Sequence, residues 1–399
     1  MTISIQIAGC TNEQNTVPDP EITIDTPPLN IGFLSEQQFE QRYAQALSIA
    51  HPDFRYHIIP MMDIVKKKIT VQQWYDKYRD QLDLLYIPNG MYRQFIELGL
   101  IQDIEPFIRK DDYSLDQFAP AVIDLTKQYG NGKLYGLAPS FNGQVLAYNK
   151  RLFEANGVDL PRNGMSWEET LSLSNRFANG LSITNSLLDL ALEIGETKGL
   201  QLYDAKSKTL FADTPSWTEI WKSVIDSLVT GSIVIDDINA FPFLNGERAM
   251  AILTYEEYMR LVKARTMFEW ATVSMPVDAT LSHKSHSLWP DGFYTIPQSS
   301  AHPDESWAMM KFFLSEDVAQ WEWLSDYGFS TRLDILTRDP EQVTNMEPFY
   351  LVDPIISEER PLPDVFLQDI DKIMNQAQAG TKSSEESLQQ IQSLSQNKY

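Results

Sequence analysis

The 399-residue chain carries a formal net charge of −23 at pH 7, and 43% of its residues are hydrophobic and 11% aromatic. This composition predicts a globular protein, and the length exceeds what one hydrophobic core usually supports, so two lobes are expected. The acidic balance argues against nucleic acid as a partner, because phosphates require a basic face.

The chain starts with a short segment that ends at its single cysteine, Cys10. Residues 7–10 have the form of a lipobox, in which signal cleavage leaves a cysteine that is acylated, and the polar residues 11–26 then form a tether. A secretory signal also needs a basic start and an apolar run of about 7–15 residues. Residues 1–6 supply neither, so three explanations stay open: a start codon placed too late, a trimmed signal, or an incidental cysteine.

From residue 29 onward, the pattern alternates between strands and helices, which favours α/β packing with parallel strands. Strands are expected at residues 29–34, 54–60, 82–87, 134–137, 145–148 and 271–276. Helices are expected at residues 36–50, 74–81, 92–98, 150–156, 170–179, 181–200, 217–230, 370–379 and 387–394. Ligands of such sheets bind beyond the carboxyl ends of the strands.

The middle of the chain contains two strand-like runs, at residues 134–137 and 145–148, separated by an irregular segment that includes Pro139. A helix at residues 150–156 follows and ends at Gly157, a residue typical of helix C-termini. Two strands joined in line suit a crossing between two lobes. A β-hairpin or a bulged strand within one domain explains the same pattern.

The residue identities in this region are more informative than its hydrophobic pattern. Residues 132–178 read GKLYGLAPSFNGQVLAYNKRLFEANGVDLPRNGMSWEETLSLSNRFA. It resembles the family 1 extracellular solute-binding proteins of bacterial ABC transporters, in which G-K-x-Y-G-x-P leads into x-Y-N-K-x-L-F-x-x-x-G-V. Further patches at residues 242–253, 302–316 and 327–332 are similar to family patterns in the same order. The resemblance covers about residues 29–399.

The resemblance implies a periplasmic-binding-protein-like fold of type II, with two α/β lobes joined by crossing segments. Residues 1–28 are then a lipobox remnant and flexible tether, residues 29–141 and 289–328 the first lobe, and residues 142–288 and 329–399 the second. It also implies a monomeric substrate-binding component of an ABC importer. Such a protein captures a saccharide or oligosaccharide by hinge closure and delivers it to permease subunits. Because of this resemblance we favour the interpretation that Cys10 is the acylated cysteine of a lipoprotein. The protein would then be anchored to the outer face of the bacterial cell membrane.

Candidate ligand contacts are aromatic and polar residues at the expected strand ends and crossings, because aromatic rings cover sugar C–H faces and polar groups bond hydroxyls. They are Phe33, Glu36, Tyr86, Asn89, Phe141, Asn142, Tyr255, Trp289, Asp291, Phe293 and Arg332. By resemblance, Tyr86 and Asn89 lie where relatives place an aromatic and a polar contact, and Asn142 lies where some relatives carry a carboxylate.

The sequence contains no metal-ligand cluster, nucleophile elbow or nucleotide-binding fingerprint, so no catalytic residue, metal or cofactor is expected. Two other functions stay open. The abundant carboxylates do not exclude a carbohydrate-active hydrolase. A sensor that presents ligand to a receptor kinase would have the same sequence features as an importer component.

Overall fold

The computed structural model describes residues 27–204, 207–237, 239–278, 280, 284–324, 328–336, 346–356 and 362–396. The predicted lipidation site Cys10 and its tether lie outside the described residues. None of the described helices is both long enough and apolar enough to cross a membrane.

The elements follow one another in three groups along the chain. The first comprises β1 (Leu29–Phe33), α1 (Glu36–Ala50), β2 (Tyr56–Pro60), α2 (Met62–Val65), α3 (Val71–Tyr78), β3 (Leu84–Pro88), α4 (Asn89–Glu97), α5 (Glu105–Lys110) and α6 (Pro120–Tyr129). The second comprises β4 (Ser140–Asn149), α7 (Lys150–Asn156), α8 (Trp167–Ser174), β5 (Leu181–Ile183), α9 (Leu187–Thr197), β6 (Tyr203–Asp204), β7 (Thr209–Leu210), α10 (Pro215–Val229), β8 (Ile233–Ile235), β9 (Met250–Thr254), α11 (Tyr255–Lys263) and β10 (Trp270–Val273). The third comprises β11 (Lys284–Ser285), β12 (Leu288–Pro290), β13 (Gly292–Thr295), α12 (Pro303–Phe313), α13 (Glu316–Leu324), β14 (Phe329–Ser330), α14 (Leu333–Leu336), α16 (Glu347–Tyr350), β15 (Asp353–Pro354), α17 (Asp364–Gln378) and α18 (Ser384–Leu394).

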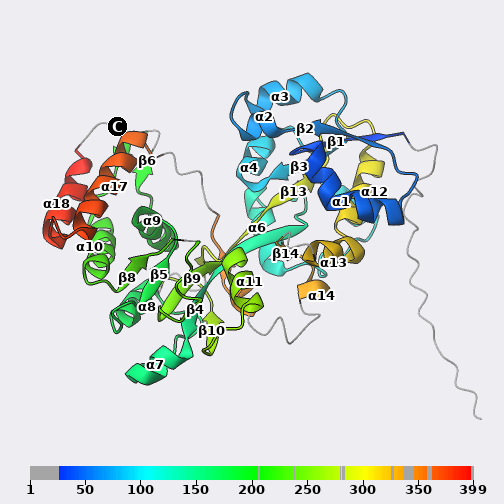
Figure 1. Ribbon diagram of the computed structural model, residues 1–399. Helices are drawn as coiled ribbons and strands as arrows, with labels where there is room; N and C mark the ends of the chain where they lie inside the picture. The colour runs from blue at the N-terminus through cyan, green and yellow to red at the C-terminus, as the bar shows by residue number, and fades with distance from the viewer. Residues whose placement is uncertain are drawn as a thin grey trace, which may run out of the picture.

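The first lobe is built on a four-stranded sheet with the order β13-β3-β1-β2 and helices on both faces (Figure 1). Strand β1 pairs in parallel with β2 and β3, whereas β13 is antiparallel to β3. One face packs on α1 and α12 through Tyr43 and Phe313, and the other packs on α3 and α4 through Trp74 and Phe95. Because both faces are covered, β3 is apolar at successive positions rather than at alternate ones.

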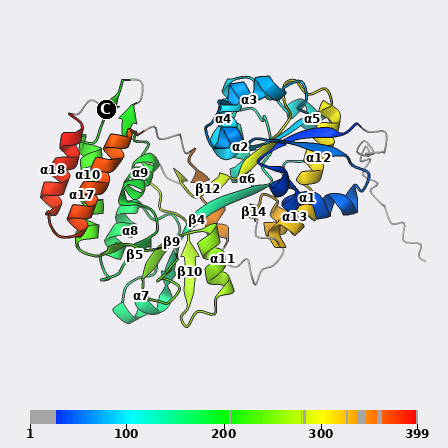
Figure 2. The ribbon, with the colours of Figure 1, turned by 45° about the horizontal axis from the view of Figure 1, so that its top comes forward.

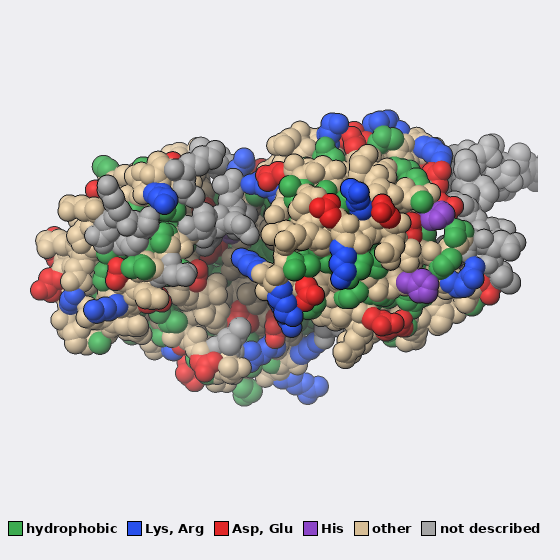
Figure 3. Space-filling view, turned by 90° about the horizontal axis from the view of Figure 1, so that it is seen from above, with side chains coloured by type: hydrophobic (Ala, Val, Ile, Leu, Met, Phe, Trp, Pro, Cys, Tyr) green, Lys and Arg blue, Asp and Glu red, His purple; other side chains and the backbone are tan. Residues whose placement is uncertain are grey.

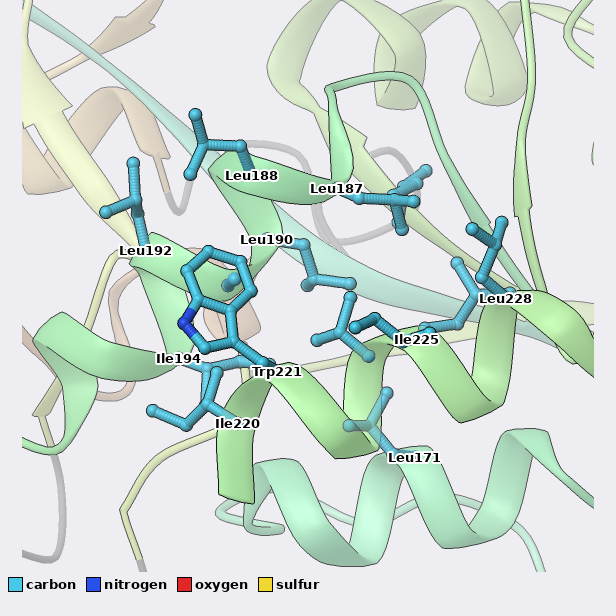
Figure 4. Packing of buried hydrophobic residues seen from close by; sticks show 14 of the residues in the cluster. Leu171, Leu187, Leu188, Leu190, Leu192, Ile194, Ile220, Trp221, Ile225 and Leu228 are labelled. Carbon is cyan, nitrogen blue, oxygen red and sulfur yellow. The ribbon is translucent and has the colours of Figure 1, made fainter. Parts of the chain in front are cut away.

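The second lobe is built on the strand order β10-β4-β9-β5-β8. Helices α9, α10, α17 and α18 contribute to the core on one face, where Trp221 of α10 lies among leucines of α9 (Figure 4). Residues of β4 alternate between the faces: Leu146 and Tyr148 belong to this core, and Val145 and Ala147 to the core that includes α11.

Three segments cross between the lobes, and β4 lies in the middle of them (Figures 1 and 2). Near its start β4 pairs antiparallel with both β12 and β14, so that Phe141 lies opposite Pro290 on one side and Phe329 on the other. Further along, β4 pairs with β9 and β10 of the second lobe. The segment is therefore a crossing and not a hairpin within one domain, and the expected α/β fold of two lobes is confirmed.

The exact lobe boundaries stay a prediction. The segment that directly follows β14 was expected in the second lobe, but it contacts the first. The Ala119 N–H donates to the carbonyl oxygen of Thr331 at 2.7 Å, and Arg332 Nη1 donates to Gln117 Oε1 at 2.9 Å. Helix α14 packs against α13.

The prediction of one helix over residues 181–200 is wrong in its first part, because the structure has a strand, a short connection and then α9. Strand β5 is inserted between β8 and β9, and this pairing with distant segments overrides local helical pattern. Helix α9 starts only after Ser186, whose hydroxyl accepts from the Asp189 N–H at 3.1 Å in a capping box.

A second difference concerns residues 134–137, which were predicted to be a strand but form only an isolated bridge between Leu137 and Tyr294. The predicted helix at residues 150–156 is confirmed as α7. It ends at Gly157 with φ of +61°, a left-handed conformation that glycine adopts without steric cost.

Candidate ligand-binding cleft

A cavity of about 440 Å³ lies between the two lobes, beside the crossing segments. Its lining comprises Asn89 and Tyr129 of the first lobe, Gln144, His286, Leu288 and Trp289 at the crossings, Asn185, Asp189 and Glu193 of the second lobe, and Ile355. Figure 3 shows the hollow between the lobes from above. The volume lies within the range of about 300–1,000 Å³ that small-molecule sites occupy.

The cleft lies at the carboxyl ends of strands from both sheets. Asn89 directly follows β3 and begins α4, and its N–H donates to the carbonyl oxygen of Asp291 at 3.1 Å. Asn185 follows β5 in the connection to α9. This is the position at which α/β sheets bind ligands.

One wall of the cleft is acidic and is formed by α9. Asp189 and Glu193 are four residues apart and so lie on the same face of the helix. Glu193 is buried, and its Oε1 accepts from Gln144 Nε2 at 3.2 Å. One turn further, Glu196 pairs with His286 Nε2. Carboxylate and amide groups of this kind accept hydrogen bonds from ligand hydroxyls.

An aromatic side chain lines the same cavity as these carboxylates. Trp289 lies on β12, opposite Asn142 of β4, and is half-buried at the cleft lining. An indole ring covers apolar C–H surface and its N–H donates a hydrogen bond. The cleft therefore combines one flat apolar surface with several polar acceptors.

A polar network joins the crossings to the first lobe. Arg42 of α1 is buried, and it donates to Glu322 Oε1 at 2.5 Å, to Ser140 Oγ at 3.2 Å and to the Tyr86 hydroxyl at 3.4 Å. Ser140 Oγ donates to Asp291 Oδ2 at 2.7 Å. These bonds connect α1, α13, β4 and the junction of β12 with β13.

Asp291 accepts a second bond within this network, from Asn142 Nδ2 at 2.5 Å. Burial raises the pKa of the Asp291 carboxyl above its ordinary value of 3.8, although the bonds from Ser140 and Asn142 and the charge of Arg42 act in the opposite direction. Gly328 lies beside the Asp291 carboxylate, and only glycine fits there without strain. A Cβ at Gly328 would lie 2.9 Å from Asp291 Oδ2, and the backbone has φ of +91°.

Of the eleven predicted ligand contacts, the structure brings Asn89 and Trp289 to the cleft lining. Asn142 and Asp291 lie at the crossings and bond each other. Arg332 bonds Asp334 and Gln117 at the first lobe.

The other six predicted contacts lie elsewhere, and five of them are buried. They are Phe33, Tyr86, Phe141, Tyr255 and Phe293 in the cores and Glu36, which is exposed in the first turn of α1. Phe33 packs on Tyr86 with ring centroids 4.9 Å apart, and Phe293 stacks on Tyr92 at 3.8 Å. Direct contact with ligand stays a prediction for all eleven, and this geometry favours Asn89 and Trp289.

Sequence reasoning missed the residues of the acidic wall because it placed them inside one long helix. The signal that could have found them is the capping pattern of Ser186 and Asp189, which marks a helix start. If the helix starts at residue 187, residues 181–183 lie before it and can form a strand. Asn185 then follows the carboxyl end of that strand.

Comparison with known proteins agrees with this architecture. The model of the bacterial extracellular solute-binding protein family matches residues 50–344, more than half of the chain. The chain belongs to this family. Its structural neighbours include family 1 solute-binding proteins of ABC transporters, as the motifs of residues 132–178 predicted.

Solved structures show the same fold at low sequence identity. An extracellular solute-binding protein family 1 member from Alicyclobacillus acidocaldarius is 15% identical with a TM-score of 0.69, covering 94% of this chain and 100% of that one. An ABC substrate-binding protein of Listeria monocytogenes in complex with cycloalternan is 15% identical with a TM-score of 0.59, covering 92% and 97%. The cyclic alpha-maltosyl-1,6-maltose binding protein of Arthrobacter globiformis is 16% identical with a TM-score of 0.59, covering 92% and 97%.

Within the described ranges, no group of three or more His, Cys, Asp or Glu side chains is placed to hold a metal ion. The expectation that the protein uses no metal or cofactor stays a prediction.

The raised pKa of Asp291 predicts a specific pH dependence of stability. A carboxyl whose pKa is higher in the folded than in the unfolded protein binds more protons when folded, so the free energy of unfolding falls as the pH rises above 3.8. Asp291→Asn removes this titration. The stability of the unmodified protein relative to Asp291→Asn should therefore fall as the pH rises from about 4 through the folded-state pKa, as measured by urea unfolding.

Asp53→Asn serves as the control, because Asp53 is exposed on the surface. A gain of stability for the unmodified protein over Asp291→Asn with rising pH would contradict the assignment.

Proposed function

We propose that this chain is the substrate-binding component of an ABC importer. It captures a saccharide between its two lobes, closes over it by a hinge motion at the three crossings, and delivers it to permease subunits. The observation that carries the proposal is the composition of the cleft, in which Trp289 and the α9 carboxylates line one cavity between the lobes.

The chemistry of this lining suits a sugar. A pyranose ring presents an apolar C–H face, which an indole covers, and a rim of hydroxyls, which carboxylates and amides bind. Asp189, Glu193 and Asn185 supply acceptors from the second lobe, and Asn89 supplies an amide from the first. Because both lobes contribute, a bound sugar gains its full set of contacts only when the lobes approach each other, which couples binding to closure.

The relatives support the same class of ligand. Structures with this fold include proteins whose descriptions name cycloalternan, maltose and cyclic alpha-maltosyl-1,6-maltose as ligands. This chain shares the fold with them at about 15% identity, so their ligands are a guide to class and not to identity.

A hydrolase acting on the same sugars is the alternative from another class. Glycoside hydrolysis uses two carboxyl groups that flank the scissile bond. Asp189 and Glu193 both project from one face of α9 and so lie on one wall of the cleft. This arrangement favours binding over hydrolysis.

The proposal predicts a thermal shift with one sugar class. Melting of the protein from residue 27 onward is measured against mono- and oligosaccharides, with amino acids and polyamines as controls. A ligand at 100 times its Kd adds about 2.7 kcal/mol to the free energy of unfolding. The glycan should be recovered intact by chromatography. A shift with amino acids or polyamines alone would contradict the saccharide assignment, and cleavage of the glycan would favour the hydrolase.

Trp289→Ala should weaken binding of the same sugar by about tenfold or more, since truncating a central tryptophan removes most of its apolar contact. Trp270→Ala is the matched control, because Trp270 is also half-buried but lies on β10 outside the cleft lining. Equal losses in the two variants, measured by calorimetry, would remove Trp289 from the binding site.

We extend the proposal to a lipid anchor on Cys10, supported by the lipobox form of residues 7–10 and by membership of an extracellular binding-protein family. When the chain is produced in a Gram-positive host behind a lipoprotein signal, the protein should fractionate with membranes and carry a diacylglyceryl group by mass spectrometry. Cys10→Ser should release it into the medium. Membrane association that survives this substitution would contradict an anchor at Cys10.

A further inference from the structure

A second and larger hollow adjoins the cleft on the first lobe. This groove has a volume of about 690 Å³ and runs between the turn after α2, the start of α3 and helix α4. It shares Asn89 and Tyr129 with the cleft, so the two hollows meet at these side chains. A ligand longer than the cleft would therefore extend past these two side chains onto the first lobe.

The groove differs from the cleft in charge. Lys67, Lys68 and Arg93 line it, and Glu97 is the one acidic residue among its described lining residues, although the chain as a whole has a net charge of −23. Arg93 lies with its guanidinium carbon 5.8 Å from the centre of the Tyr129 ring, at the junction with the cleft. Basic side chains lie on the side of the first lobe that borders the hollow in Figure 3.

The turn that carries the two lysines is fixed by its backbone. The Lys67 N–H donates to the carbonyl oxygen of Ile64 at 3.0 Å, and the Lys68 N–H donates to that of Asp63 at 2.9 Å. Lys67 has φ of +53°, a conformation that is uncommon for residues with a side chain. Lys68 also pairs with Asp63 at 3.1 Å, but both side chains are more than half exposed, and solvent screens such pairs so that they contribute little.

Two helices add to the positive potential, because each begins at the groove. Thr70, Val71 and Gln73 at the start of α3 and Asn89, Gly90 and Met91 at the start of α4 belong to its lining. Helix α4 has no side-chain cap on its first turn. The N-terminus of a helix carries a partial positive charge, which adds to the charge of nearby lysines. The Gln73 N–H of α3 is already bonded to the Thr70 hydroxyl at 3.1 Å, and the Asn89 N–H of α4 to the carbonyl oxygen of Asp291 at 3.1 Å.

We propose that the groove binds the anionic end of an oligosaccharide whose neutral units occupy the cleft. The anionic group is a carboxylate, sulfate or phosphate held by Lys67 and Lys68. The acidic wall of Asp189 and Glu193 repels such a group, so the solute is oriented with its charged end on the first lobe. This inference rests on the proposed saccharide-binding function and specifies its substrate class.

The test compares binding of neutral and anionic oligosaccharides by calorimetry. Maltotriose and cellotriose are the neutral probes, and trigalacturonate, a chondroitin sulfate tetrasaccharide and maltotriose phosphate are the anionic ones. At least one anionic probe should bind tenfold or more tightly than every neutral probe. Its affinity should fall as the salt concentration rises, since exposed charges are screened.

The double variant Lys67→Asn with Lys68→Gln should remove this preference while leaving the affinity for neutral probes unchanged. Asparagine is used at residue 67 because it tolerates positive φ. Lys66→Gln is the matched control, because Lys66 is an exposed neighbour that does not line the groove.

The carboxylate, sulfate and phosphate probes distinguish the source of the charge. Neutral probes binding as tightly as every anionic one, or a double variant that keeps the preference, would overturn this inference and leave the proposed function intact. No binding of any saccharide would overturn both.

Discussion

The buried pair of Arg42 and Glu322 lies at the centre of the polar network on which the attachment of the crossing segments to the first lobe depends. A buried charge is costly unless it is paired and hydrogen-bonded, and removing one partner of such a pair typically costs about 3–5 kcal/mol. Arg42 satisfies this requirement by bonding α13 through Glu322 and the start of β4 through Ser140. Ser140 in turn bonds Asp291 at the end of the second crossing. The Arg42 guanidinium thus connects α1 directly to β4, and through Ser140 to the end of the second crossing. It also bonds α13, the helix that precedes the third crossing.

This network explains why the cleft lies where it does. Trp289 is two residues from Asp291, and the Asn89 N–H bonds the Asp291 carbonyl, so two lining residues are positioned directly by the crossing. The opposite wall comes from α9, which belongs to the core of the second lobe. The two walls of the cleft therefore belong to different lobes, which the crossings join, as a protein that closes around its ligand requires.

The α/β class and helix α7 could be predicted from the alternating pattern and from cap residues such as Gly157. The crossing at β4 followed from the family resemblance, because the local pattern also allowed a hairpin. Asn89 could be placed in the cleft for a related reason, since it directly follows an apolar strand. The aromatic residues of the same strand ends were less predictable. Strand position does not specify which face a ring occupies, and Phe33 and Tyr86 pack into the core.

Two features were beyond sequence reasoning for a physical reason. The strand at β5 is stabilised by pairing with β8 and β9, and no residue near it encodes those partners. Arg42 and Glu322 are 280 residues apart, so only the folded chain brings them together. In both cases the deciding energy comes from contacts distant in sequence, whereas local pattern reports only on neighbours.

The central claim of this account is that the lobes close around a saccharide by movement at the three crossings. Small-angle X-ray scattering of the protein from residue 27 onward, with and without the saccharide that raises its melting temperature, tests this most directly. The account predicts a smaller radius of gyration in the complex and no change with a sugar that does not bind. Saturating binding with an unchanged radius of gyration would contradict hinge closure.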